Sequence, residues 1–309
     1  GCRGAVSGPA APPPGSVTPA GATPRLQMLA AAARVSTGGT AIKLTQLGGL
    51  QVACLRSGVA AVALLLLARD ARRGWSWRTP LVGLVSALTL ILFVSANKLT
   101  TAANAIFLQA TAPLYLLVLS PLLLRERVRA ADLGFLAVMG GGLALFFLGH
   151  EDCCSTAPDP ARGNLLAAAS GFTWALTIAG LRWLARSTPG DGGSGGAAVP
   201  ATVAANVLGC LLCAPFAFPL GSVRALDLGV IVFLGVLQIA VAYLFLTASM
   251  RRVPAFEGAL LLLLEPVLSA LLAAVVHDEQ PGPHALAGGL LILAATLAQA
   301  WHARRQARA

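Results

Sequence analysis

Charged residues are scarce in this 309-residue chain, since Asp, Glu, Lys and Arg together make up only 11% of it. Soluble globular proteins carry about 25% charged residues. Hydrophobic residues make up 57% of the chain, and its mean hydropathy is +0.77. This number of polar groups is too small to cover a folded 31.4 kDa protein in water. Most of the surface must therefore face lipid. The composition argues against an ordinary water-soluble enzyme.

Several motifs typical of soluble proteins are also absent. No Gly-rich loop ends in Gly-Lys-Ser or Gly-Lys-Thr, which excludes ATP hydrolysis by this chain. The net charge is +10, but the basic residues form short clusters without interleaved aromatic residues, so a nucleic-acid partner is excluded. The four histidines fall at the ends of predicted helices, and their spacing assembles neither a metal site nor a catalytic triad.

Cysteine is present but provides no evident set of metal ligands. Cys54, Cys210 and Cys213 lie inside apolar stretches, where a free cysteine behaves as a small hydrophobic residue. Cys153 and Cys154 lie in a polar loop without a second ligand pair nearby, which is a weak basis for zinc or redox chemistry. We therefore expect no metal, no cofactor and no enzymatic activity.

The first 25 residues form a leader of unusual composition. Sixteen of them are Gly, Ala or Pro, so residues 1–25 are expected to be disordered. The leader has no acidic residue and no apolar core segment, which argues against a secretory signal. A transit-peptide remnant and a truncation both remain compatible with this segment.

Long apolar runs make up most of the remaining sequence. A helix needs roughly 20 apolar residues to cross the hydrocarbon core of a bilayer. The first run is the weakest, because Arg34, Lys43 and Ser36-Thr37-Gly38-Gly39 interrupt it. We predict an all-α integral membrane protein with ten transmembrane helices, over residues 26–46, 49–68, 80–97, 101–124, 131–149, 164–184, 201–220, 228–249, 254–276 and 284–301.

The loops between these runs alternate in charge. Cytoplasmic loops of membrane proteins hold an excess of Lys and Arg. One set of loops holds only Lys98, Arg162 and Arg224, whereas the leader, the other set of loops and the C-terminal tail hold nearly all the other basic residues. The alternation predicts that both termini face the cytoplasm, or the stroma or matrix of an organelle. The expected location is a bacterial plasma membrane or an organellar envelope membrane.

The chain repeats itself in two halves. Residues 110–113 (Ala-Thr-Ala-Pro) match residues 263–266 (Leu-Leu-Glu-Pro), and residues 31–33 match residues 167–169 (both Ala-Ala-Ala). Each half contains five predicted helices, and because five is odd, the two copies enter the membrane from opposite sides. Such inverted repeats are typical of alternating-access carriers. The expected organisation is the leader, a five-helix repeat over 26–149, a second over 164–301, and a basic cytoplasmic tail over 302–309.

Short motifs recur in a specific order along about residues 29–301. They are Ala41-Ile42-Lys43, Leu55-Arg56, Ala112-Pro113 with Glu126, Trp174-Ala175, and Glu265-Pro266 with Glu279. In this order they resemble the drug/metabolite transporter superfamily with its paired EamA-like domains. The chain departs from that pattern at Val35-Ser36, where Trp-Gly is usual, and at His277-Asp278-Glu279, where a Gly-Glu-Arg type of end is common. The resemblance implies a ten-helix carrier that moves small organic metabolites, often as an exporter.

Ionisable side chains within apolar helices are candidates for function, because each costs roughly 2.5–3.5 kcal/mol to insert. Glu265 lies about halfway along its predicted helix, which places it near the bilayer midplane. Pro266 follows it, and Pro113 occupies the matching place in the first half; each removes a backbone hydrogen bond at mid-membrane. Glu265 either takes part in substrate binding or coupling, or forms a structural salt bridge with Lys43 or Arg56.

The other candidates are basic, acidic and uncharged polar residues. Lys43 and Arg56 are expected to point to the interior, where they bind an anionic substrate group or form structural pairs. Glu126 and Glu279 end their helices on opposite sides of the membrane, either as paired gates or as solvated helix ends. Side chains that can bond a substrate or a neighbouring helix are Asn97, Asn104, Gln109, Trp174, Gln238 and Tyr243.

These features predict a secondary transporter of small organic metabolites, an exporter or an exchanger, that works by alternating access. The alternative within transport is an organellar sugar-phosphate or nucleotide-sugar antiporter. The alternatives from another class are a passive channel and a membrane-embedded enzyme. The expected partners are a small-molecule metabolite, a coupling proton, the lipid bilayer, and a second copy of the chain in a homodimer.

Overall fold

The computed structural model describes residues 22–123, 130–148, 155–186, 194–250, 261–262 and 264–306, and within these ranges the fold is all-helical. The elements are α1 (Ala22–Leu44), α2 (Gly49–Leu67), η1 (Arg69–Arg72), α3 (Thr79–Leu99), α4 (Ala102–Gln109), α5 (Ala112–Leu123), α6 (Ala130–Leu148), α7 (Pro160–Arg186), α8 (Ser194–Ala217), α9 (Ala225–Val232), η2 (Phe233–Val241), α10 (Ala242–Met250), α12 (Leu264–His277) and α13 (Pro283–Gln306).

The prediction of ten helices is confirmed within the described residues. The fourth predicted helix is divided into α4 and α5, and the eighth into α9, η2 and α10. Of the ninth, residues 254–260 and 263 lie outside the described residues, residues 261–262 are helical, and α12 begins at Leu264. Seven of the described helices are long and apolar enough to cross a membrane, and α6 and α12 contain shorter apolar stretches.

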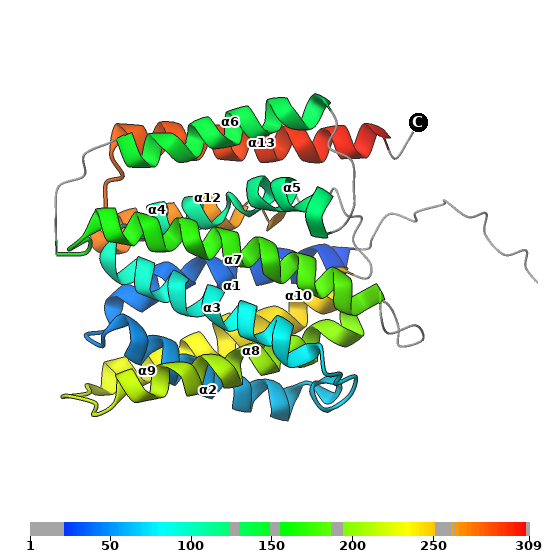
Figure 1. The fold of residues 1–309 in the computed structure, drawn as a ribbon. Helices are drawn as coiled ribbons and strands as arrows, with labels where there is room; N and C mark the ends of the chain where they lie inside the picture. Colours follow the sequence, from blue (N-terminus) through cyan, green and yellow to red (C-terminus); the bar gives the residue numbers. More distant parts are fainter. Residues whose placement is uncertain are drawn as a thin grey trace, which may run out of the picture.

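The two halves are interleaved rather than placed side by side. Figure 1 shows the helices running along one common direction, with α6 and α13 paired at one edge of the bundle. The first-half helix α3 packs against α7 and α8 of the second half, and α1 packs against α10 and α12. Helices of the first half therefore pack directly against helices of the second half inside the bundle as well as at its edge.

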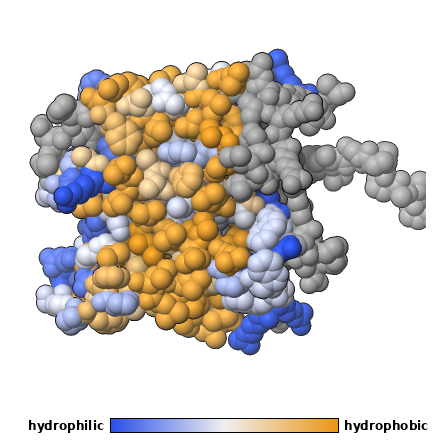
Figure 2. Space-filling view, viewed as in Figure 1, coloured by the Kyte–Doolittle hydropathy of each residue, from blue (hydrophilic) through white to orange (hydrophobic). Residues whose placement is uncertain are grey.

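The surface agrees with a membrane location. On the face seen in Figure 2, hydrophobic residues cover the middle of the bundle, and hydrophilic residues lie toward its two ends. Large apolar side chains such as Leu66, Leu211 and Val275 are exposed. Exposed apolar area of this extent is favourable in lipid and not in water. The chain is a multi-pass integral membrane protein.

Several helix boundaries differ from the predicted ones. The first helix begins at Ala22, inside the predicted leader, and it continues through Gly38 and Gly39 without interruption. The second half begins with a helix from Pro160 rather than residue 164, because proline is well tolerated in the first turn. The last helix extends to Gln306, into the predicted tail, because hydropathy marks only the apolar part of a helix that continues into water.

The two matching prolines lie at helix starts rather than within continuous helices. Pro113 is the second residue of α5, after a break at Ala110 and Thr111, where the Thr111 hydroxyl donates to the Leu108 carbonyl at 2.6 Å. Pro266 is the third residue of α12. A proline in the first turn removes no intrahelical bond. The expected mid-helix kinks are thus helix starts at corresponding places in the two halves.

The topology prediction can be tested at two exposed residues, Arg72 and Ser155. Cysteines introduced at these positions, after replacement of Cys153 and Cys154, are expected to react with a membrane-impermeant maleimide from opposite sides of the membrane. The reason is that an odd number of predicted helices separates the two positions. Labelling in sealed vesicles of known orientation is the measurement, with permeabilised vesicles as the control. Labelling of both cysteines from the same side would contradict the ten-helix topology.

Candidate functional site

An ion pair joins the two halves at one end of the bundle. Lys43 Nζ, near the end of α1, lies 2.7 Å from Glu279 Oε1, just beyond α12, and the two side chains are 4% and 1% exposed. The Lys43 ammonium also donates to the Thr100 carbonyl at 2.7 Å and to the Thr156 carbonyl. Glu279 Oε2 accepts a hydrogen bond from the Ala102 amide at 2.8 Å. We call this end of the bundle the Lys43 end.

The surroundings of the pair suit each charge separately. Two backbone carbonyls, of Thr100 and Thr156, face the ammonium. The amide of Ala102, the first residue of α4, faces the carboxylate, and a helix N-terminus favours a negative charge. His277 Nε2 lies 2.9 Å from the Thr40 carbonyl and adds a further contact between the end of α12 and α1.

This geometry corrects two of the sequence-based alternatives. Lys43 is paired with Glu279 and not with Glu265, and its ammonium is engaged by protein atoms. Glu279 is buried, so it is not a solvated helix end. Sequence reasoning missed the contact because 236 positions separate the partners and nothing in the local pattern links them. Glu126, the other gate candidate, lies outside the described residues.

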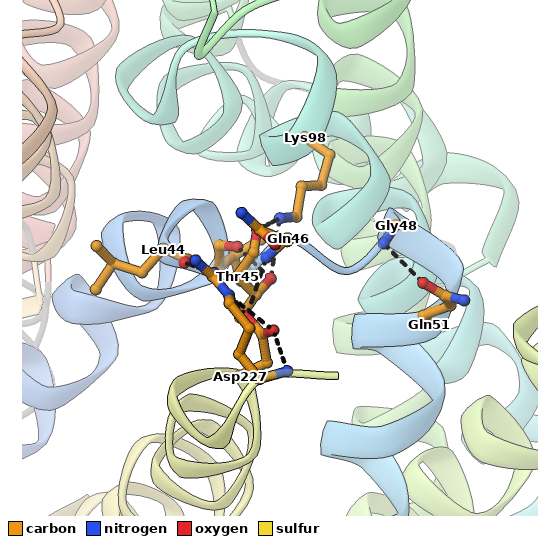
Figure 3. A network of polar contacts seen from close by, with 9 residues as sticks. Leu44, Thr45, Gln46, Gly48, Gln51, Lys98 and Asp227 are labelled. Atoms are coloured by element: carbon orange, nitrogen blue, oxygen red, sulfur yellow. Dashed lines mark hydrogen bonds and ion pairs between the residues drawn. The ribbon is translucent and has the colours of Figure 1, made fainter. Parts of the chain in front are cut away.

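A second polar network reinforces the same end of the bundle (Figure 3). Lys98 Nζ, in the last turn of α3, donates to the Thr45 carbonyl at 2.7 Å and lies 2.9 Å from the Thr45 hydroxyl. Asp227, in the first turn of α9, accepts from the Gln46 amide at 3.0 Å and pairs with Arg224 at 3.0 Å. The hydrogen bond to Asp227 raises the pKa of the Arg224 guanidinium above its ordinary value. The link between α1 and α2 is thereby bound to both halves.

Arg56 lies deep in the bundle, without a counter-ion among the described residues. Its side chain, on α2, is 2% exposed and is the largest fully buried side chain of the described residues. No described residue forms an ion pair or hydrogen bond with it, and its Nε atom has no partner. A buried guanidinium without a partner is costly, because it loses the water that solvated it. Arg56 is therefore suited to an anionic group that arrives from outside the protein.

A cluster of uncharged polar side chains surrounds two glycines of α1. A Cβ atom on Gly38 would lie 2.7 Å from Gln238 Nε2, and one on Gly39 would lie 2.9 Å from Asn97 Oδ1 and 3.5 Å from Ser269 Oγ. These side chains come from η2, α3 and α12, so both halves contribute. We call Gly38, Gly39, Asn97, Gln238 and Ser269 the glycine cluster. Any side chain larger than hydrogen at the two glycines would displace its polar members.

The glycine cluster contains buried oxygen atoms to which no described residue donates a hydrogen bond. Asn97 is completely buried, and its Nδ2 donates to the Phe93 carbonyl at 2.9 Å. This bond fixes the orientation of the amide, so Oδ1 faces Gly39 as an acceptor. Within the described residues neither Asn97 Oδ1 nor Gln238 Oε1 has a partner. Buried polar atoms are nearly always paired in folded proteins, so these two are available to a ligand or to water.

Glu265 lies one helical turn from the glycine cluster. It is the second residue of α12 and stands four positions before Ser269, which places both side chains on one face of that helix. Glu265 is half-buried, and among the described residues it forms no ion pair and no hydrogen bond. The predicted salt bridge of Glu265 with Lys43 or Arg56 is therefore not formed in this structure.

The remaining predicted residues lie elsewhere. Asn104 Nδ2, in the first turn of α4, donates to Thr100 Oγ1 and to Asn164 Oδ1, each at 3.3 Å, so it belongs to the Lys43 end. Pro266 is buried, whereas Gln109, Pro113 and Tyr243 are half-buried. Trp174 is 42% exposed on α7 and does not point into the buried interior.

Sequence reasoning missed three members of the glycine cluster. In the sequence, Gly38 and Gly39 read as an interruption of the first helix, whereas two adjacent glycines inside a membrane helix also indicate a close approach of other atoms. Ser269 gave no signal, because small residues are common wherever membrane helices pack. The described residues contain no group of three or more His, Cys, Asp or Glu side chains that can hold a metal ion.

The chain matches a family model and a solved structure. The model of the EamA-like transporter family matches twice, over residues 25–148 and 161–299. A crystal structure of a protein with 23% sequence identity shares the fold with a TM-score of 0.59, and the match covers 92% of this chain and 98% of that chain. No curated protein sequence matches significantly. With two EamA domains spanning nearly all of its helices, the chain belongs to the EamA-like transporter family, a non-enzymatic family of the drug/metabolite transporter superfamily.

Proposed function

We propose that this chain is a secondary active transporter that exports or exchanges small organic metabolites by alternating access between two inverted halves. The observation that carries this proposal is the buried Lys43–Glu279 pair, which holds the end of α1 against the end of α12 and thus joins the two halves at one end of the bundle. Two charged groups on different halves can separate and re-form as the halves rock. A permanently open pore does not need a contact between the halves that breaks and re-forms.

The interior provides groups that a substrate can contact. Arg56, without a partner in the described residues, supplies a positive charge for an anionic group. The glycine cluster supplies uncharged polar atoms from both halves. A substrate between the halves would therefore contact elements that move relative to one another during the transport cycle.

Transport can be tested by counterflow in proteoliposomes. A substrate is first found by screening metabolites for thermal stabilisation of the purified protein, since a ligand that prefers the folded form raises its apparent stability. Uptake of the labelled substrate is then expected to increase when the vesicles contain the unlabelled substrate. A passive channel would give no such stimulation, and an enzyme would convert the substrate chemically. A strict preference for phosphorylated sugars or nucleotide sugars would favour the antiporter alternative.

A further inference from the structure

We propose that the glycine cluster and Glu265 bind a primary ammonium group, so that the transported metabolite is an amine. This inference rests on the proposed transport function and names the chemical class of its substrate. The site lies beside Gly39 on α1, with Asn97 of α3 and Ser269 of α12 on its sides and Glu265 one turn away on α12. No member of this set is engaged in the ion pairs at the Lys43 end.

The site offers acceptors to a donor. An ammonium group carries three N–H donors and no acceptor. Asn97 Oδ1 is a buried acceptor without a partner among the described residues, and the amide cannot offer its Nδ2 instead, because Nδ2 is bound to the Phe93 carbonyl. The Ser269 hydroxyl makes no hydrogen bond with any described residue and lies near the same place on Gly39. The Glu265 carboxylate adds a further acceptor on the Ser269 face of α12.

The charges favour an ammonium group over an uncharged donor. A cation that enters the low-dielectric interior must be compensated by a negative charge and by hydrogen bonds. Glu265 supplies a negative charge that is not paired with any described residue. A hydroxyl or methyl group in the same place would leave Glu265 without a counter-ion. An anionic group beside Gly39 would be repelled by Asn97 Oδ1 and by the Glu265 carboxylate.

The two glycines of α1 let polar side chains approach its backbone closely. A Cβ on Gly39 would approach Asn97 Oδ1 to 2.9 Å and Ala102 Cβ to 3.0 Å, so alanine at this position would press on the acceptor. Glycine costs roughly 0.5–1 kcal/mol relative to alanine inside a helix. The two glycines thus keep the Asn97 oxygen and the Gln238 amide beside the backbone of α1, with no side chain between them.

The test uses binding to the full-length purified protein in detergent, measured by thermal stabilisation without any gradient. The probes are primary amines of several skeletons, namely alkyl monoamines, diamines and amino carboxylates, each with its hydroxyl and methyl analogue. At least one amine is expected to stabilise the protein while its two analogues do not. Equal stabilisation by the analogues, the absence of stabilisation by every amine, or an equal effect of sodium chloride alone would each overturn the proposal.

Variants assign the binding to this site. Asn97→Leu and Ser269→Ala each remove one acceptor and are expected to weaken binding of the stabilising amine about tenfold. Asn206→Leu is the matched control: Asn206 is also completely buried, also donates to the carbonyl four residues before it, at 2.8 Å, and also has an unpaired Oδ1. Asn206 lies on α8, and the atoms nearest to a Cβ on Gly38 or Gly39 belong to other residues.

The outcomes separate the site from the transport function. A purely structural role of Asn97 would lower the stability of Asn97→Leu and Asn206→Leu alike and leave the ligand-induced shift of both unchanged, which overturns the proposal. Ser269→Ala leaves no new unpaired atom, so it provides the result if Asn97→Leu does not fold. Amine binding without counterflow would refute the proposed transport and leave the ammonium site in place. Counterflow of a substrate that lacks an amine would support the proposed transport and refute the ammonium site.

Discussion

Replacing Glu265 by glutamine is expected to abolish substrate-coupled uptake and its pH dependence, while expression and monodispersity stay close to those of the unchanged protein. A carboxyl group in the transport path can take up and release a proton, and it can carry the charge that a cationic substrate needs. The glutamine amide can do neither. Because no described residue pairs with Glu265, its neutralisation leaves no buried counter-ion behind.

The measurement is uptake into proteoliposomes at a series of pH values, with and without an imposed proton gradient. Glu265→Asp keeps the charge and is expected to retain part of the activity and its pH dependence. Size-exclusion chromatography of both variants controls for folding. Unchanged transport by a well-folded Glu265→Gln protein would show that a charge at this position is not needed.

The helices were predictable because hydropathy measures what a membrane requires of each segment. The predicted ranges 49–68 and 80–97 differ by at most two residues at any end from α2 and α3. The boundaries failed where a helix leaves the lipid, as at the end of α13, because a helix continues in water without an apolar signal. The π-helical segment η2 was not predictable, since Phe233–Val241 is apolar apart from Gln238 and carries no mark of a changed hydrogen-bond pattern.

The candidate site was predictable in its polar members and not in its pairing. Asn97, Gln238 and Arg56 were recognisable because polar side chains inside apolar helices are rare. Their neighbours depend on how two halves pack, which the sequence of either half does not contain. Lys43 illustrates this. Its charge was evident from the sequence, but its partner Glu279 lies in the second half, just after the predicted helix over 254–276. The cluster at Gly39 likewise requires three elements of the bundle to meet.

Removing one partner of the Lys43–Glu279 pair is expected to produce the largest loss of stability in the bundle. Glu279→Gln leaves the Lys43 ammonium buried without a counter-ion, which costs about 3–5 kcal/mol. The double variant Lys43→Met with Glu279→Gln removes both charges and is expected to recover most of this loss. Exchange of the two charges is expected not to recover it, because the carboxylate would then face the Thr100 and Thr156 carbonyls and the ammonium would face the Ala102 amide.

Thermal unfolding of the purified variants measures these differences. The matched control is Asp159→Asn. Asp159 pairs with Arg162 at 3.2 Å, also at the Lys43 end, but the Asp159 side chain is 35% exposed and that of Arg162 is 82% exposed. Exposed pairs contribute about 0–1 kcal/mol, and asparagine preserves the cap of α7 on the Arg162 amide. A loss in Asp159→Asn as large as that in Glu279→Gln would show that burial of the Lys43–Glu279 pair is not the cause.

The double variant Lys43→Met with Glu279→Gln also tests whether the pair closes the Lys43 end. Thr40 is buried on α1 one turn before Lys43, and cysteine replaces its side chain with little change in volume. In a background without native cysteines, Thr40→Cys is expected to resist a membrane-impermeant maleimide applied from the side of the Lys43 end. In the double variant the same cysteine is expected to react, because no ion pair then holds α1 against the end of α12. Equal labelling of Thr40→Cys with and without the pair would contradict its role as a gate.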